Sequence, residues 1–327
     1  MGTILDSRIA TGVTSAHRTI SGFWGRLLAI VLDGFVLGIV GFVSGLFFFD
    51  FYARLGGWGR LIGFGADSMY FGILNSAIGK GQTIGKRIMK IEVTNKFGEH
   101  IPLGQSLLRN TILGVPFFLN GILAPPSLVM SPVGYVIGFI VFGIGGAIIY
   151  LYIFNRRTRQ SLHDLVVGTF VTKTTPQGSV PLIPLWRPHL AIIGVWFITI
   201  LGLLVFIPAL SQRGVFPELL AVQKSIQLSG KVHAATATVG KSWGTSSGKK
   251  WESNYFRTNA ILKERPSDYE GAAREIAAIV LRDYPEVMKK DVMAVTITYG
   301  YDIGIARSWR SQNVQHSPQE WQDILRK

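Results

Sequence analysis

The chain of 327 residues contains no cysteine, which excludes disulfide bonds and thiolate metal sites. It is also poor in charge, because only 16% of its residues are Asp, Glu, Lys or Arg while 48% are hydrophobic. Its six histidines never fall two to a helical turn, so no metal site is predicted. We therefore expect a protein that is not an enzyme and that holds no metal and no cofactor.

Long apolar runs are what the chain has instead, and each is long enough to cross a bilayer as a helix. The third run contains Pro116 and Pro125–Pro126, so a crossing and a re-entrant hairpin are both open from its own residues. The five runs are Leu27–Phe49, Leu61–Gly79, Thr111–Met130, Pro132–Phe154 and Leu190–Leu210.

Basic residues predict how these runs are oriented. Residues 80–110 are rich in Lys and Arg, and a second basic stretch begins at Arg156. Both should face the cytoplasm, so an even number of crossings must separate them, and the run at 111–130 must cross. The prediction is a multi-pass protein of the cell inner membrane with five crossings and a cytoplasmic N-terminus.

Charge density divides the chain further, since residues 1–210 carry 23 charged residues and residues 211–327 carry 29 in about half the length. The predicted fold class is an α-helical polytopic membrane bundle followed by a small soluble α+β domain. The predicted segments are 1–22 (cytoplasmic), 23–173 (four crossings), 174–189 (Pro-rich linker), 190–210 (fifth crossing) and 211–327 (extracytoplasmic domain).

The net charge of +14 has two interpretations. In the membrane part the basic residues lie beside apolar runs, where they set orientation and meet anionic headgroups, which argues against nucleic acid as a partner. The lipid bilayer and its anionic headgroups are the expected partners. Residues 211–327 remain a candidate surface for a protein partner.

The first apolar run carries polar and small residues in a pattern. Asp33 interrupts the run two helical turns after Arg26, and a carboxylate inside a membrane costs roughly 2.5–3.5 kcal/mol. Small residues at a spacing of four and three allow another helix to approach closely, either within the bundle or across a homo-oligomer seam. The stripe consists of Gly34, Gly38, Gly41 and Gly45.

Three stretches together resemble the RDD family of bacterial membrane proteins, named for one arginine and two aspartates. The first runs from Gly22 to Asp33, with the arginine at position 26. The second is Gly-Gln-Thr-Ile-Gly-Lys-Arg at residues 81–87, and it resembles the family's cytoplasmic loop through Gln82, Gly85, Lys86 and Arg87. The third is Gln-Ser-Leu-His-Asp at residues 160–164, where Asp164 matches the second aspartate.

The resemblance covers residues 20–173 and not the last apolar run or the tail. Transport, including sodium–proton antiport, has been proposed for members of the family. The resemblance therefore implies transport of a small ion or solute, with proton-linked cation exchange as the first hypothesis. The alternative is a non-catalytic membrane scaffold or sensor whose C-terminal domain binds a partner or an envelope component.

Two interpretations apply to the polar residues of the bundle. A buried carboxylate can relay protons, with Asp33, Asp67 and His163 as the candidate sites. Alternatively, Asp33 forms a latch to Arg26, Lys86 or Arg87 that ties the first run to the cytoplasmic loop. We expect Arg26, Asp33 and Asp164 to form one polar cluster at the cytoplasmic boundary.

The glycine-rich loop at residues 79–87 is not a phosphate-binding loop. A Walker motif requires glycine at position 80 and Ser or Thr at position 87, where this chain has Lys80 and Arg87. The loop instead predicts a basic stretch on the inner leaflet, with Ile84, Ile88, Met89 and Ile91 dipping into it.

The tail has the local signals of a small α+β fold. Residues 232–263 predict a hairpin, and Ser267 begins a capping motif for an amphipathic helix. A strand follows at Val292–Thr298, its pattern resumes near Ile303–Trp309, and Ser317 begins a last short helix.

Overall fold

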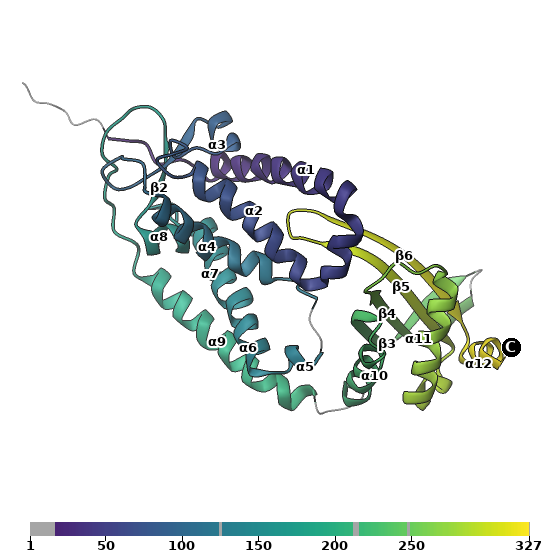
Figure 1. Ribbon diagram of the computed structural model, residues 1–327. Helices are drawn as coiled ribbons and strands as arrows, with labels where there is room; N and C mark the ends of the chain where they lie inside the picture. Colours follow the sequence, from purple (N-terminus) through teal and green to yellow (C-terminus); the bar gives the residue numbers. More distant parts are fainter. Residues whose placement is uncertain (1–16, 124–125, 212–215, 247–248, 327) are drawn as a thin grey trace, which may run out of the picture.

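The computed structural model describes residues 17–123, 126–211, 216–246 and 249–326, and the N-terminal segment predicted at 1–22 lies mostly outside them. Five helical runs lie side by side, each antiparallel to the next, and a sheet with three helices stands at one end (Figure 1). Three helical stretches are long and apolar enough to cross a membrane: Phe23–Leu74, Pro132–Phe154 and Pro188–Phe206.

The first of these stretches contains two helices with a sharp turn between them. α1 spans Phe23–Leu55 and α2 spans Gly59–Leu74, joined by a 3-10 turn at Gly56–Trp58. Gly56 has a φ of 53° at the end of α1, a conformation that favours glycine. The chain thus reverses direction directly between the two runs.

The third run differs from its prediction. α4 spans Leu103–Leu119, so it begins eight residues before Thr111 and contains Pro116. Pro102 at the N-cap can begin a helix because its missing N–H needs no partner there. Residues 124–125 lie outside the described chain, and α5 (Pro126–Val129) follows them. At 17 residues α4 is about as long as α2, which has 16, and it runs antiparallel along α2.

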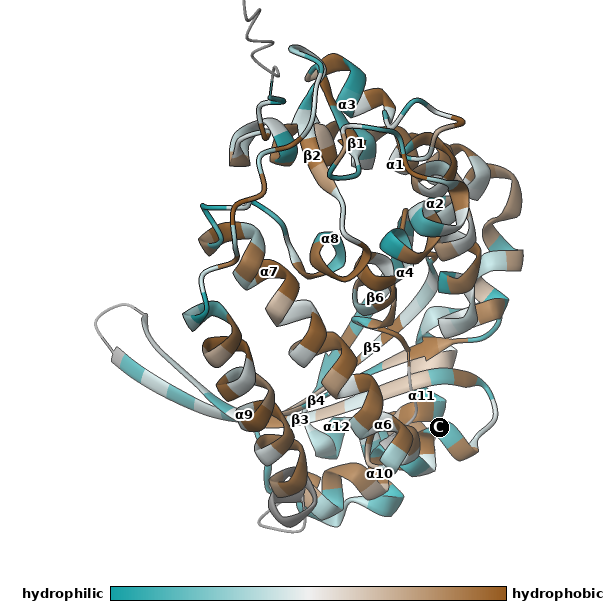
Figure 2. Ribbon diagram, turned by 90° about the vertical axis from the view of Figure 1, so that its left-hand side faces the viewer, coloured by the Kyte–Doolittle hydropathy of each residue, from teal (hydrophilic) through white to brown (hydrophobic). Residues whose placement is uncertain are grey.

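The remaining apolar runs agree with the predicted positions. α6 (Pro132–Gly138), a π-helical stretch (Phe139–Ile144) and α7 (Gly145–Phe154) form one continuous helix, and α9 (Pro188–Ser211) packs against it. Figure 2 shows that α7 and α9 are hydrophobic along most of their length. The Trp196 indole of α9 donates hydrogen bonds of 3.1 and 3.2 Å to the Phe142 and Gly143 carbonyls of the π-helical stretch.

A small polar cap covers the end of the bundle opposite the sheet. It contains α3 (Ile84–Ile88), α8 (Leu162–Val167) and the antiparallel strands β1 (Ile91–Thr94) and β2 (Phe170–Lys173). Ile91 is buried with Ala29 of α1. The prediction that Ile91 dips into the leaflet is therefore wrong, because β1 pairs with β2 and turns that side chain inward, whereas Ile84 and Ile88 are exposed.

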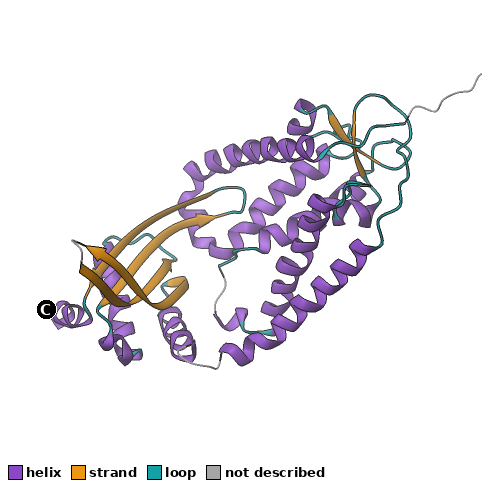
Figure 3. Ribbon diagram, turned by 180° about the vertical axis from the view of Figure 1, so that it is seen from behind, coloured by secondary structure: helices purple, strands orange, loops and turns teal. Residues whose placement is uncertain are grey.

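The C-terminal part is a four-stranded sheet whose helices cover one face (Figure 3). The strand order is β3-β4-β5-β6, with β4 and β5 parallel and the outer pairs antiparallel. The elements are α10 (Phe216–Leu228), β3 (Val232–Ser246), β4 (Lys249–Leu262), α11 (Tyr269–Asp283), a 3-10 turn (Pro285–Lys289), β5 (Val292–Asp302), β6 (Arg307–His316) and α12 (Pro318–Arg326).

Local signals predicted most of this domain. The hairpin of β3 and β4 lies where the alternating pattern placed it, and Ser317 caps α12 through reciprocal hydrogen bonds with Glu320. The cap of α11 differs, because the Asp268 carboxylate rather than Ser267 accepts the free N–H groups at its start. The core packs Phe256, Val295 and Trp321 between sheet and helices.

Candidate functional site

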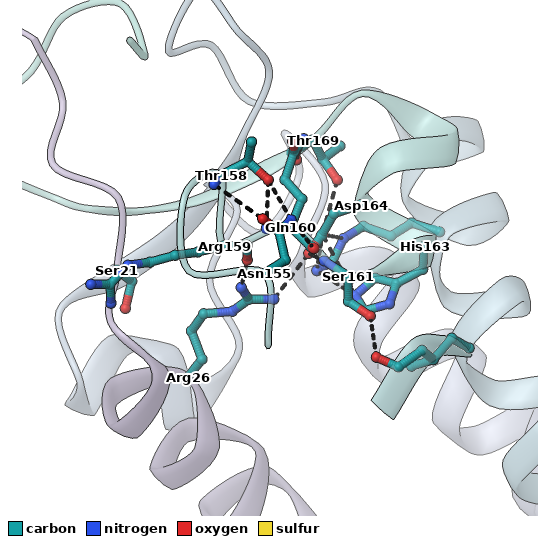
Figure 4. Close-up of polar contacts among 12 residues, drawn as sticks. Ser21, Arg26, Asn155, Thr158, Arg159, Gln160, Ser161, His163, Asp164 and Thr169 are labelled. Carbon is teal, nitrogen blue, oxygen red and sulfur yellow. Dashed lines mark hydrogen bonds and ion pairs between the residues drawn. The ribbon is translucent and has the colours of Figure 1, made fainter. Parts of the chain in front are cut away.

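The polar cap is organised around Asp164, which is fully buried at the start of α8. Asp164 Oδ2 accepts a hydrogen bond of 2.9 Å from Arg26 Nη2 of α1, and Oδ1 accepts bonds of 2.9 and 2.7 Å from Arg109 Nε and Nη2 of α4. Thr169 donates to the same Oδ1 at 3.1 Å, and the Ser161 N–H donates to Oδ2 at 3.3 Å. Figure 4 shows Arg26 and Asp164 pointing toward one another.

This arrangement joins three helices through one carboxylate, a unit called here the Asp164 clamp (Arg26, Arg109 and Asp164). Burial alone would raise the pKa of Asp164, but the guanidinium groups of Arg109 and Arg26 hold it well below its usual range. The carboxylate therefore stays ionised and acts as a fixed counter-ion.

Asp33 lies in a separate group of contacts, and the expectation of a single cluster with Arg26 is wrong. Its oxygens accept hydrogen bonds from the Tyr70 hydroxyl (2.7 Å), the Thr83 hydroxyl (2.5 Å) and the Gly85 N–H (2.7 Å). These neutral donors tie α1 to α2 and to the loop before α3. Asp33 thus forms a latch to the loop, but its partners are hydroxyl and backbone groups rather than Arg or Lys.

Gly85 shows why the loop needs glycine. A Cβ added there would collide with the Ala29 carbonyl of α1 and approach the Asp33 carboxyl carbon to 3.0 Å. Because the backbone of this loop approaches α1 so closely, its N–H can reach Asp33. Gln82 supports the same loop by donating a hydrogen bond of 3.0 Å to the Ile91 carbonyl, while Arg87 is exposed.

Lys86 points into the bundle and is buried. Its ammonium group donates to the Asn75 side-chain oxygen at 2.7 Å and lies 5.7 Å from the Phe71 ring centroid. Among the described residues no carboxylate lies within ion-pair distance of Lys86 Nζ. Burial is the main cause that lowers the pKa of Lys86 to about 7, and repulsion from Arg109 is the second cause.

His163 is buried beside the Asp164 clamp, and its ring has a defined tautomer. Arg109 Nη2 lies 3.2 Å from His163 Nε2, and a guanidinium can only donate, so Nε2 must accept. The proton is therefore on Nδ1, which has no hydrogen-bond partner among the described residues. Burial lowers the pKa of His163 to about 3, which argues against a proton-collecting role near neutral pH.

A cavity of about 590 Å³ runs through the bundle from this basic end. It is lined mostly by apolar side chains of α1, α4 and α7, and Arg26, Lys86, Arg109 and His163 line it as well. Asp67 and Asn110 also line it, and the Asn110 amide donates to Asp67 at 2.9 Å. Within the described residues no three His, Asp or Glu side chains gather closely enough to hold a metal ion.

The other end of the cavity is lined by Gly304 and Ile305, which belong to the C-terminal domain. They form the tip of the hairpin of β5 and β6, called here the 303–306 tip, which reaches alongside α1 and α2 (Figure 1). Arg60 of α2 forms a salt bridge of 2.5 Å with Asp302 and also donates a hydrogen bond to the carbonyl of Asn120, the residue that follows α4.

The glycine stripe of α1 receives this hairpin rather than another helix. A Cβ added at Gly41 would lie 2.7 Å from the Ala306 Cβ, and one at Gly45 would collide with the Tyr301 ring. Gly38 lies near the Ile305 carbonyl, whereas Gly34 has no heavy atom within 4 Å of its built Cβ. The helix-packing prediction therefore identified a contact surface but not what packs on it.

The site contains residues that the sequence analysis missed. Arg109 was counted with the basic loop, but it lies inside α4 beside Ser106 and Asn110, so three buried polar residues interrupt an apolar helix. These polar residues within an apolar run were the sequence signal that could have identified Arg109 as part of the site. Tyr70, Thr83 and Asn75 had no signal of their own, because hydroxyl and amide groups are common near membrane boundaries.

Comparison with known proteins matches the region that holds both groups of contacts. Residues 20–168 match the model described as "RDD family". The uncharacterized protein YckC of Bacillus subtilis (strain 168) is 26% identical over 163 residues, which make up 48% of this chain and 86% of that protein. No solved structure matches the chain.

Proposed function

Since residues 20–168 belong to the RDD family, we propose that this membrane protein is a non-catalytic module that couples an extracytoplasmic domain to the cytoplasmic end of a five-span bundle. The C-terminal domain would bind a partner or an envelope component, and the bundle would respond through the 303–306 tip. The observation that carries the proposal is that this tip packs closely against glycines of α1 and α2, a contact called here the seat of the hairpin.

The seat is specific because glycine is required at several points around it. A Cβ at Gly63 of α2 would collide with the Ile303 carbonyl, and a Cβ at Gly41 would crowd Ala306. Charge and hydrogen bonds hold the surrounding domain, through Arg60 with Asp302 and through the Tyr299 hydroxyl, which donates to Asp50 at 2.7 Å. Such contacts favour a rigid attachment rather than a tethered domain.

α1 provides the connection between the two ends. It is 33 residues long, or about 50 Å at 1.5 Å per residue, and it carries Arg26 and Asp33 near its start and Gly41 and Gly45 further along. A displacement of the hairpin therefore acts on the same helix that holds the Asp164 clamp and the Asp33 latch.

Hydrogen exchange tests this coupling. Gly63→Leu should unseat the hairpin and increase amide exchange in residues 80–94 and 160–173 of the purified full-length protein. Gly65→Leu is the matched control, because Gly65 lies two residues further on the same helix and has nothing within 4 Å of its built Cβ. Unchanged exchange at the polar cap in Gly63→Leu, with the hairpin released, would contradict the proposal.

Transport of a small ion is the second candidate function, with proton-linked cation exchange as its specific form. The observation in its favour is that Asp67 and Asn110 line the cavity within the bundle. Asp33 is a weaker candidate, because three donors already occupy its oxygens. Proteoliposomes with a pH-sensitive dye test this candidate: Asp67→Asn should abolish cation-driven proton flux, and Asp33→Asn serves as the comparison.

A further inference from the structure

The basic end of the cavity has unused hydrogen-bond donors. Nδ1 of His163 carries a proton without a partner, and the Tyr152 hydroxyl is also buried without a partner among the described residues. His163 is 3% exposed, and both side chains line the cavity. A buried donor without an acceptor costs free energy, so an acceptor bound beside these two cavity-lining side chains would be stabilised.

The charges at this end have the matching sign. Arg26, Arg109 and Lys86 line the cavity as three basic groups, while the Asp164 clamp uses one carboxylate to pair with both arginines. Asp33 is satisfied by neutral donors, and Lys86 has only the Asn75 amide oxygen. The end that holds the unused donors therefore attracts an anion.

The rest of the cavity is apolar and opens toward the outside of the bundle. Ile30 of α1, Phe117 of α4 and Ile149 of α7 line it, and these three side chains are 45%, 61% and 61% exposed. In a bilayer these surfaces face acyl chains, so a molecule can enter sideways between the helices. The opening suits a chain of methylene groups better than a soluble ion.

We propose that the cavity binds an anionic phospholipid from the surrounding bilayer, with its head group at His163, Tyr152 and Lys86 and one acyl chain along α1, α4 and α7. The position of the basic end beside the polar cap places the head group at the depth of the cytoplasmic leaflet. This site differs from headgroup contact with the outer surface of the basic loop, because the lipid lies inside the bundle.

The ligand would also complete contacts that the protein leaves open. A phosphate oxygen accepts hydrogen bonds from His163 Nδ1 and from the Tyr152 hydroxyl, and it provides the counter-ion that Lys86 lacks. The acyl chain would reach toward Ile305 of the 303–306 tip, which lines the opposite end. A bound lipid thus touches both the polar cap and the docked domain.

Native mass spectrometry of the full-length protein in mild detergent tests the proposal. Phosphatidylglycerol and phosphatidylcholine with identical acyl chains are added separately, and palmitate is a third addition. We expect phosphatidylglycerol to be retained about ten-fold more strongly than phosphatidylcholine. Equal retention of the two phospholipids, or retention of palmitate alone, would overturn the proposal.

Two variants locate the binding. Tyr152→Phe removes only the unpartnered hydroxyl and should weaken phosphatidylglycerol retention about five-fold, as expected for one hydrogen bond. Gly34→Leu should place a side chain in the cavity and reduce retention at least ten-fold, because Gly34 lines the cavity and nothing lies within 4 Å of its built Cβ.

The matched control for the second variant is Gly65→Leu, which adds the same side chain to an open position outside the cavity and should retain lipid as the wild type does. Wild-type retention in Gly34→Leu would exclude this cavity as the site. If Gly34→Leu fails to fold, Tyr152→Phe decides the question, because the Phe ring preserves the packing and full retention would contradict the assigned head-group position.

Discussion

At the scale of single residues, the arginine and aspartates of the family have different roles in this chain. Arg26 and Asp164 form a charged clamp with Arg109, whereas Asp33 is held by hydroxyl and backbone N–H groups. Both groups of contacts are buried and join segments far apart in the sequence. Their common effect is to fix loops to helices, which is a structural role before any other.

Removing the shared carboxylate tests the clamp. Asp164→Asn should leave Arg26 and Arg109 buried without a counter-ion and reduce the free energy of unfolding by about 3–5 kcal/mol. Thermal unfolding in detergent and the yield of folded protein measure the effect. Asp323→Asn is the control, because Asp323 belongs to an exposed ion pair with Arg326 and should change stability little. A folded Asp164→Asn protein of wild-type stability would contradict the clamp.

Acid should destabilise the polar cap through His163. Burial lowers the pKa of His163 to about 3, below its ordinary value of 6.5. As the pH falls, His163 therefore becomes protonated in the unfolded chain before it does in the folded protein. The stability contribution is complete above pH 6.5 and decreases by up to about 1.4 kcal/mol per pH unit as the pH falls toward 3.

The measurement is the unfolding temperature between pH 7 and pH 4, with His163→Gln as the comparison. The Gln oxygen can accept from Arg109 as Nε2 does, but Gln does not titrate, so its profile should be flatter. Lys86 titrates at the upper edge of this window, and Asp164 of the unfolded chain begins to bind a proton at its lower edge. Both groups are present in the two proteins, so the difference between the profiles reports His163. Identical profiles for the two proteins would show that His163 does not titrate on unfolding.

At the scale of elements, the main unexpected contact is between the hairpin of β5 and β6 and two apolar helices. The spacing of Gly38, Gly41 and Gly45 predicted a close approach but not its partner. The partner lies about 260 residues later in the chain, and a contact between such distant segments leaves no local pattern. By contrast, the β3–β4 hairpin and the cap of α12 follow from neighbouring residues alone, and these predictions are confirmed.

A cysteine pair tests the hairpin contact directly, because the chain has no cysteine of its own. Gly41→Cys with Ala306→Cys should form a disulfide in membranes, since the two Cβ positions lie close together and a small shift reaches disulfide geometry. Thiol alkylation followed by mass spectrometry measures the bond. Gly34→Cys with Ala306→Cys is the control, because Gly34 lies about two turns from Gly41. Equal cross-linking of both pairs would contradict the docked arrangement.

At the scale of the whole molecule, the RDD region and the C-terminal domain form one arrangement rather than two independent parts. The family match ends at residue 168, yet the hairpin that lines the cavity lies beyond it. Composition and hydropathy predicted a membrane bundle and a small α+β domain in that order. They could not predict the docking, because it depends on backbone shape at glycines and not on hydrophobic pattern.

Accessibility of single cysteines tests the predicted orientation. Lys250→Cys in β4 should react with a membrane-impermeant maleimide added to spheroplasts, whereas Lys96→Cys should react only after the membrane is permeabilised. Both positions are exposed, so burial does not limit either reaction. The reverse pattern would invert the predicted topology. Labelling of both positions from outside would require an even number of crossings between Lys96 and Lys250.

The seat of the hairpin also determines the order of biogenesis. Tyr301 and Ala306 are translated after every apolar segment, so the helices that carry Gly41, Gly45 and Gly63 are synthesised before the hairpin that packs against them. Until the hairpin docks, the surface beside these glycines has no protein partner. Docking of the hairpin is therefore a late step of maturation, and the rate at which the sheet folds sets how long the undocked form persists.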